Sequence, residues 1–372
     1  MQKLQEGLSL RAAAALLALF YIGHMGIDHA GQGLGTDGWI AVLLGFVLSV
    51  PMLLIFSRLT RLMPGANLFE MLERGFGRRF SYVISVLYLA YFLFLAAMVL
   101  GQVEFIRTVS LPRTPLVVLL LFFFGAAVYF THGGVPAMGK WSVLTIYILL
   151  SIFVLLSLLS IENMRVSNLL PIGTVGSGAL FWSGYRVMVV PMGAGVVFLA
   201  LIGRSAKWVS FYKVFFFGAG FAALFFVGTF LRDLAILGVS GMAGLTYPAY
   251  HAASGIQIGA GGGRVESLVT VSVSLSALIM LAVCLYAAAC ALRRVTVRRE
   301  SRGMGIPAGI LALGLTLFLG TAYARQLPLE SWYLRYAPVV QAGIPLLLWA
   351  VLEVRVKRRG GAVSKVAEEK GE

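Results

Sequence analysis

The stretch FYIGHMGIDHAGQG, residues 20–33, interrupts the first apolar segment of the chain with four glycines, two histidines and an aspartate. A second stretch, VVPMGAGVV at 189–197, interrupts a later apolar segment with one proline and two glycines. Proline removes a backbone hydrogen-bond donor, and glycine lowers the cost of unwinding a helix. Because unwound backbone inside a membrane is tolerated only where protein encloses it or a watery cavity adjoins it, the two stretches predict broken helices that border a site.

The composition around these stretches is that of a membrane protein. Of the 372 residues, 59% are hydrophobic and only 12% are charged. A bilayer core takes about 20 apolar residues per helix, and windows of that length recur with short polar breaks. We expect ten membrane-spanning helices, at 9–35, 38–57, 81–106, 115–131, 141–160, 184–203, 211–231, 266–292, 305–324 and 335–354.

The two interrupted windows occupy corresponding places in the chain. Ten windows divide into five and five, and each interrupted window is the first of its half. Segments interrupted by Gly or Pro at corresponding positions are typical of transporters built from an inverted repeat. Glycine also serves close helix packing in membranes, which would explain either stretch alone. The paired position favours broken helices, whose freed N–H groups suit a carboxylate and whose carbonyls suit an ammonium group or a cation.

The net charge of +15 follows membrane topology rather than nucleic-acid binding. Basic residues gather in alternate connections, such as 57–80 and 293–302, and at the C-terminal end. Lysine and arginine are enriched on the cytoplasmic side of membrane proteins. We therefore expect both termini in the cytoplasm, a lipid membrane as the surroundings, and no nucleic-acid partner.

One permease domain is expected over residues 1–356, followed by a charged, disordered cytoplasmic tail over 357–372. The connection 57–80 should contain a short helix on the membrane surface, and 232–265 is either a flexible connector or an element that caps a binding site. Motifs of phosphate loops, serine hydrolases and zinc sites do not occur. Cys284 and Cys290 fall within one apolar window as small core residues. We expect no enzyme, no cofactor and no metal.

Several further motifs resemble those of one family. They are NLFEMLERGFG at 67–77, FIRTVSLPRTP at 105–115, NLLPIG at 168–173, VPMGAG at 190–195, LTYPAYHAASGIQIG at 245–259 and CLYAAACAL at 284–292. In this order and spacing they resemble the spore germination permease family. Its members are the membrane B subunits of nutrient germinant receptors, a branch of the amino acid-polyamine-organocation superfamily.

The resemblance implies an all-α integral membrane fold of about ten helices, a LeuT-like 5+5 inverted repeat with helices 1 and 6 broken. It also implies a small nutrient, usually an amino acid, bound between those helices, and A and C partner subunits in the inner membrane of a spore. Many family members have an acidic residue where this chain has Ala194, and some have a basic residue within the window 266–292, which is apolar here. A receptor subunit is favoured over a self-sufficient secondary transporter of amino acids or polyamines.

The candidate ligand-binding residues lie at the two interruptions and on the third window. They are Gly23, His24, Met25, Gly26, Tyr88, Tyr91, Pro191, Met192, Gly193, Ala194 and Gly195. His24 lies beside the first break with Asp28 four residues later. The two could pair, bind a cation, face a vestibule, or be polar residues near the outer water interface. Tyr88 and Tyr91 either present hydroxyls to a cavity or pack between helices.

Overall fold

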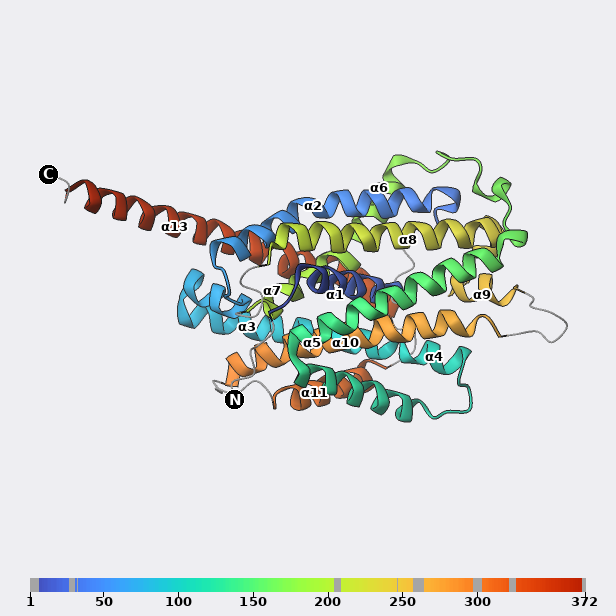
Figure 1. Ribbon diagram of the computed structural model, residues 1–372, viewed down its shortest axis with the longest axis horizontal. Helices are drawn as coiled ribbons and strands as arrows, with labels where there is room; N and C mark the ends of the chain where they lie inside the picture. The colour runs from blue at the N-terminus through green and yellow to red at the C-terminus, as the bar shows by residue number, and fades with distance from the viewer. Residues whose placement is uncertain are drawn as a thin grey trace.

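Most of the described chain is helical, and none of the described residues forms a strand (Figure 1). The computed structural model describes residues 7–26, 31, 33–203, 209–245, 247–256, 264–296, 303–320 and 326–369. The α-helices are α1 (Leu10–Ile22), α2 (Gly38–Leu62), α3 (Leu68–Gly101), α4 (Val103–Val109), α5 (Leu116–Leu159), α6 (Ser177–Val187), α7 (Val197–Leu201), α8 (Phe211–Met242), α9 (Pro248–Ser254), α10 (Ser267–Thr296), α11 (Gly305–Leu319), α12 (Gln326–Pro338) and α13 (Ile344–Glu369). Short 3₁₀ helices cover Gly23–Gly26, Gly35–Asp37, Ile161–Asn163, Val166–Leu169 and Gly193–Val196, and π-helical turns cover Met188–Met192 and Val339–Gly343.

Seven helical segments of the described chain are long and apolar enough to cross a membrane, against ten expected windows. The difference comes from three helices. α5 has 44 residues and contains two expected windows, because it bends at Gly134, whose φ of 75° is a conformation that favours glycine. α1 and α11 are apolar but have only 13 and 15 residues. With these three helices included, every expected window has a helical counterpart.

α1 lies at the centre of the bundle. Leu16, Leu17, Leu19 and Phe20 are all 0% exposed, and the helix packs against α5, α8 and α10, which surround it in Figure 1. A helix that is apolar on all sides is typical of a buried position. The turn Gly23–Gly26, which directly follows α1, therefore starts from a buried helix at the centre of the bundle.

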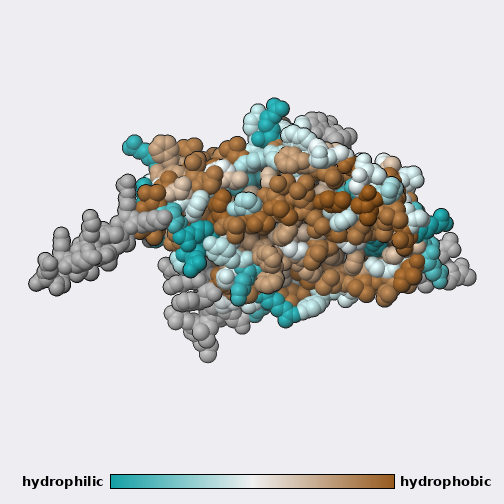
Figure 2. All heavy atoms as spheres, turned by 90° about the horizontal axis from the view of Figure 1, so that it is seen from above, coloured by the Kyte–Doolittle hydropathy of each residue, from teal (hydrophilic) through white to brown (hydrophobic). Residues whose placement is uncertain are grey.

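Apolar side chains also cover the outside of the bundle. Figure 2 shows a broad band of hydrophobic surface with the strongly hydrophilic residues at its margins. Large side chains in this surface include Phe122, Trp182 and Phe318, which are 66%, 67% and 83% exposed. Apolar surface of this extent marks contact with another apolar phase. The protein is an integral membrane protein, and this surface faces lipid.

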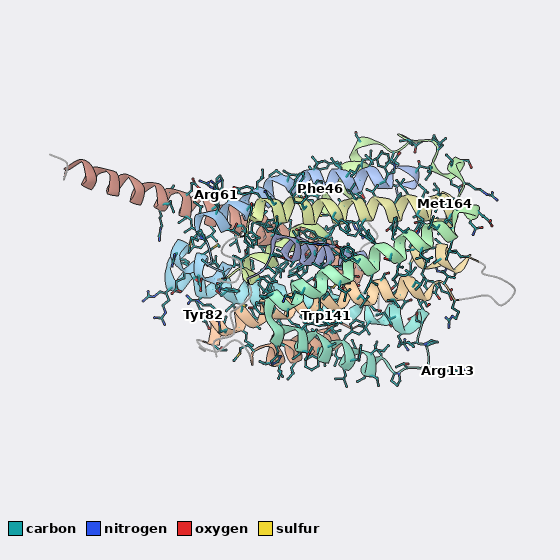
Figure 3. The ribbon with its side chains drawn as sticks, in the orientation of Figure 1. Phe46, Arg61, Tyr82, Arg113, Trp141 and Met164 are labelled. Atoms are coloured by element: carbon teal, nitrogen blue, oxygen red, sulfur yellow. The ribbon has the colours of Figure 1, made fainter. Side chains whose placement is uncertain are left out.

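One end of the bundle, called the arginine-rich end, holds the α2–α3 connection and the C-terminal end of α10. Its arginines include Arg58, Arg61, Arg74, Arg78, Arg79, Arg293 and Arg294. Figure 3 shows Arg61 and Tyr82 there, and Arg113 and Met164 at the opposite end, called the α9 end. α3 begins with a capping box between Asn67 and Glu70 and bends at Gly77, whose φ is 79°. Its first turns thus form the short helix expected within 57–80.

At the α9 end, the family-like motif NLLPIG ties two spanning helices together. The carboxylate of Asp37, a residue that is 0% exposed, accepts hydrogen bonds of 2.7–2.9 Å from the three backbone N–H groups of Gly173–Val175. The side chain of Asn168 donates to the carbonyl oxygen of Ala235 at 2.9 Å, just before α8 bends at Gly238. The motif therefore fixes the start of α2 against the bend of α8.

Two boundaries differ from the expected ones. α8 runs to Met242, so the first part of the expected connection 232–265 belongs to a spanning helix, and α9 follows as a helix of seven residues. α13 is helical as far as Glu369. The division into a permease domain over 1–356 and a disordered tail over 357–372 stays a prediction.

Candidate ligand-binding site

The first predicted break is a change of helix type at the end of α1. The α-helix ends at Ile22 and continues as one 3₁₀ turn, Gly23–Gly26. At Gly23 the chain approaches α10 so closely that a Cβ atom would lie 2.9 Å from Met280 Cβ and 3.1 Å from the carbonyl oxygen of Ser276. A side chain at this position would force the two helices apart. Gly23 therefore serves close packing as well as the change of helix type.

Two buried side chains hold the backbone at this turn. Gln102, which follows α3, donates from Nε2 to the carbonyl oxygen of Gly23 at 3.2 Å. His24 Nδ1 lies 3.0 Å from the carbonyl oxygen of Phe20. Because a carbonyl only accepts, Nδ1 carries the proton and Nε2 is an acceptor in the neutral ring. His24 is 2% exposed and Gln102 is 4% exposed.

Each of these two side chains keeps an acceptor without a partner in the described part of the chain. The atoms are His24 Nε2 and Gln102 Oε1, and both are buried. Leaving a buried polar atom without a hydrogen bond costs about 1–3 kcal/mol, so such an atom in a native protein needs an explanation. Two acceptors beside the same turn suit a bound group that donates hydrogen bonds, such as an ammonium group.

The second predicted break is also a change of helix type. α6 passes into the π-helical turn Met188–Met192, then into the 3₁₀ turn Gly193–Val196 and α7. Pro191 has no N–H, so the carbonyl one turn before it lacks its usual helical partner. Two carbonyls of the π-helical turn are bonded by other helices. Val189 accepts from Gln341 Nε2 at 2.9 Å, and Met192 accepts from the Tyr21 hydroxyl at 3.3 Å.

Gln341 is the centre of a buried polar cluster that the sequence analysis missed. It lies in the π-helical turn between α12 and α13 and is 1% exposed. Its Nε2 lies 2.8 Å from the Tyr91 hydroxyl and 2.9 Å from the Tyr333 hydroxyl, and the two hydroxyls are 3.0 Å apart. Tyr88 donates to the carbonyl oxygen of Val340 at 3.0 Å. The cluster joins α3 to the two π-helical turns, Met188–Met192 and Val339–Gly343.

Two glycines of the sixth window make room for these contacts. A Cβ atom at Gly193 would collide with the amide of Gln341, and one at Gly195 would collide with the hydroxyl of Tyr21. Ala194 between them is 0% exposed. Side chains of the protein itself therefore occupy the space beside these glycines in this conformation.

The structure thus gathers the predicted residues in two neighbouring groups. The first, at the end of α1, contains Gly23 and His24. The second, around Gln341 and Tyr333, contains Tyr88, Tyr91, Pro191, Met192, Gly193, Ala194 and Gly195. Tyr21 connects the groups through its bond to Met192. Met25 and Gly26 belong to the 3₁₀ turn, and Asp28 lies outside the described residues.

A cavity of about 140 Å³ begins beside the end of α1. Ile22 precedes Gly23 in the chain and Ser276 packs against it, and both line the cavity. The other walls come from α4, α5, α8, α9 and α10. The cavity thus adjoins the end of α1, although neither His24 nor Gln102 lines it.

Comparison with known proteins decides the family. The family model described as Spore germination protein matches residues 14–320. The chain belongs to this family. The family assignment expected from the short motifs is confirmed, and it covers most of the chain.

Three curated relatives are spore germination proteins of Bacillus subtilis (strain 168). Spore germination protein KB is 21% identical over 362 residues, which cover 95% of this chain and 96% of the relative. Spore germination protein YndE is 25% identical over 219 residues, covering 58% and 60%. Spore germination protein A2 is 24% identical over 333 residues, covering 87% of each chain.

Solved structures with a similar fold are transporters. A Na⁺-coupled sialic acid symporter has a TM-score of 0.63 at 12% identity and covers 92% of this chain and 78% of its own. Mhp1, a nucleobase-cation-symport-1 family transporter, has a TM-score of 0.59 at 16% identity and covers 90% and 78%. These similarities confirm the LeuT-like fold. The family model describes a spore germination protein, and the two similar solved structures are transporters.

Proposed function

We propose that this protein is the membrane subunit of a nutrient germinant receptor, which binds a small nutrient such as an amino acid and triggers germination together with A and C subunits. The match to the spore germination family over residues 14–320 supports this role. The proposed location is the cell membrane or the inner membrane of a spore. Both termini and the arginine-rich end face the cytoplasm, because lysine and arginine are enriched on that side.

Two buried hydrogen-bond acceptors at the end of α1 support the proposed ligand site. His24 Nε2 and Gln102 Oε1 are buried, and each lacks a donor within the described residues. An ammonium group would satisfy both. Ala194 provides no carboxylate in the sixth window, so a neutral or zwitterionic nutrient fits better than a polyamine, whose several charges would each need a buried partner.

The contacts between the distorted turns supply a route from ligand to partner subunits. Tyr21 bonds the turn of the sixth window from α1, and Gln341 bonds the same turn from the tenth window. A ligand shifts a conformational equilibrium only through its different affinity for the two states. A nutrient held at Gly23 and His24 would act two and three residues from Tyr21, and so on the hydrogen bond between Tyr21 and Met192.

Deletion in a spore-forming host tests the function. Spores without this protein should lose the response to one class of nutrient, while uptake of that nutrient by vegetative cells stays unchanged. Normal germination of the deleted spores would contradict the receptor role. The second candidate, a self-sufficient secondary transporter, is favoured by the transporter folds of the similar structures. It predicts the opposite result, with lost uptake and normal germination.

A further inference from the structure

α8 contains an ion pair in which both side chains are buried, and the pair lies outside the site proposed above. Arg232 donates from Nη2 and Nε to Asp233 Oδ1 at 2.6 Å and 2.9 Å. The two side chains are 6% and 5% exposed. Removing charges from water costs several kcal/mol per ion, and charged residues within membrane-spanning helices are by default functional candidates. This pair takes no part in the hydrogen bonds described above for the distorted turns of α1 and α6, or in those of Asp37 and Asn168.

Both charged side chains line the cavity of about 140 Å³ that begins beside Ile22. Most of its remaining wall is apolar. Thr229 of α8 and Ser272 of α10 are polar residues in this lining. An engineered cavity of about 150 Å³ in another protein binds benzene. The space therefore suits a single aromatic ring or a branched alkyl group.

The ion pair leaves one donor and one acceptor for a ligand. Asp233 Oδ1 takes both hydrogen bonds from Arg232. Among the described residues, Oδ2 accepts no hydrogen bond and Arg232 Nη1 donates none. A carboxylate would accept from Nη1, and a neighbouring ammonium group would donate to Oδ2. Because the pair has no net charge, a zwitterion keeps the cavity neutral, whereas a singly charged ligand would bury an uncompensated charge.

α9 covers this cavity at the α9 end. Tyr247 and Tyr250 line it from α9 and the residue before that helix. The ring centre of Tyr247 lies 3.9 Å from that of Phe105 on α4. Arg264 bonds Glu266 at 3.2 Å, and hydrogen bonds to Glu266 and Tyr250 raise the pKa of Arg264. Tyr247 and Tyr250 thus cover the cavity, and the expectation that 232–265 contains an element that caps a binding site stays a prediction.

We propose that this cavity is a second ligand-binding site, which takes a small zwitterion with an apolar group the size of a branched alkyl chain or a benzene ring. The inference goes beyond the proposed function, because His24 and Gln102 do not line the cavity and no role in germination is required. Ile22 and Ser276, which do line it, connect a ligand there with the turn at Gly23.

Binding to the purified full-length protein in lipid nanodiscs tests the ligand chemistry. The probe is radiolabelled L-leucine, and the competitors are isopentylamine, which lacks the carboxylate, and 4-methylpentanoate, which lacks the ammonium group. L-Leucine should bind saturably, and each competitor should be weaker than unlabelled leucine by at least about tenfold, because each loses a hydrogen bond between charged groups. Competition equal to that of leucine by either analogue would overturn the proposal. So would the absence of leucine binding, which would leave a cavity that holds water only.

Two cavity-filling variants test the location. Ser272→Phe puts a ring into the cavity, and the matched control Ser274→Phe lies two residues away on α10, outside the lining. Each serine hydroxyl bonds only a carbonyl of its own helix, Leu268 at 3.0 Å and Thr270 at 2.7 Å, so the two changes remove equivalent contacts. Ser272→Phe should weaken leucine binding by at least about tenfold, and Ser274→Phe should leave it unchanged. Thr229→Leu fills the same space from α8 if Ser272→Phe does not fold.

The outcomes separate this site from the proposed function. Unchanged leucine binding in both filling variants removes the second site and leaves the receptor role standing. Deleted spores that germinate normally remove the receptor role, while the cavity and its binding data stand on their own.

Discussion

Replacing Gln341 with leucine tests the coupling between the three distorted helices. Leucine has a similar volume and stays comfortable among apolar neighbours, but it cannot donate a hydrogen bond. The carbonyl oxygen of Val189 would lose its 2.9 Å bond to Gln341. The hydroxyls of Tyr91 and Tyr333 would keep each other as partners at 3.0 Å.

The expected cost follows from counting bonds. An amide nitrogen carries two hydrogens, so Gln341 Nε2 makes two bonds at a time among its three short contacts. Losing one bond to a hydroxyl costs about 0.6 kcal/mol, the average for such bonds between membrane helices. Leaving the Val189 carbonyl without a donor adds about 1–3 kcal/mol. The variant should lose about 2–4 kcal/mol of stability in total.

Thermal unfolding of the purified protein in detergent, followed by size-exclusion chromatography, measures this loss as a lower melting temperature. Ser142→Ala is the control, because Ser142 is equally buried and its hydroxyl bonds only Met138 of its own helix. The control should melt close to the unaltered protein. Equal melting temperatures for Gln341→Leu and the control would refute the claim that Gln341 holds the turn of the sixth window.

Three further predictions concern the backbone and the ligand site. Gly134→Ala should destabilise the protein by about 1–2 kcal/mol, because φ is 75° there. The control Gly125→Ala in the same helix should be neutral or stabilising. Equal melting temperatures of the two variants would refute the role of φ. Asp37→Ala should cost about 3–5 kcal/mol, because three backbone N–H groups lose their hydrogen bonds to a charged carboxylate. Asp37→Asn should recover part of the loss in the same melting assay. Gly26→Val and Gly193→Val should abolish the nutrient response of spores at unchanged protein levels, and an unchanged dose response in both would remove these glycines from the site.

The sequence predicted the broken helices because Gly and Pro act locally. The turn at Gly23 and the π-helical turn at Pro191 follow from the conformations those residues allow. The ten windows followed from length and hydropathy alone. The bend of α5 at Gly134 was not predicted, because a glycine between two apolar windows carries no sign of its φ.

The partners of the broken helices were missed because they are set by packing between distant segments. Gln341 lies 152 residues from the carbonyl it bonds, and Gln102 lies 79 residues from Gly23. The sequence did contain a signal for Gln341, because it is a polar residue in an apolar window between Pro338 and Gly343. A proline and a glycine also flank the break at Pro191 and Gly193. The pair of Arg232 and Asp233 was missed because α8 was expected to end at residue 231.

The central claim is that the buried acceptors at the end of α1 bind the ammonium group of the nutrient. The most direct measurement is the nutrient dose response of spores that carry His24→Phe or Gln102→Leu, with the protein quantified in the spore membrane. Thr108→Val is the control, because Thr108 is exposed and bonds only its own helix through the carbonyl oxygen of Glu104.

Each of the two site variants removes one acceptor, so the concentration for half-maximal germination should rise by about tenfold or more, while the control germinates as the unaltered spores do. A dose response that is unchanged in both site variants, at equal protein levels, would contradict the account.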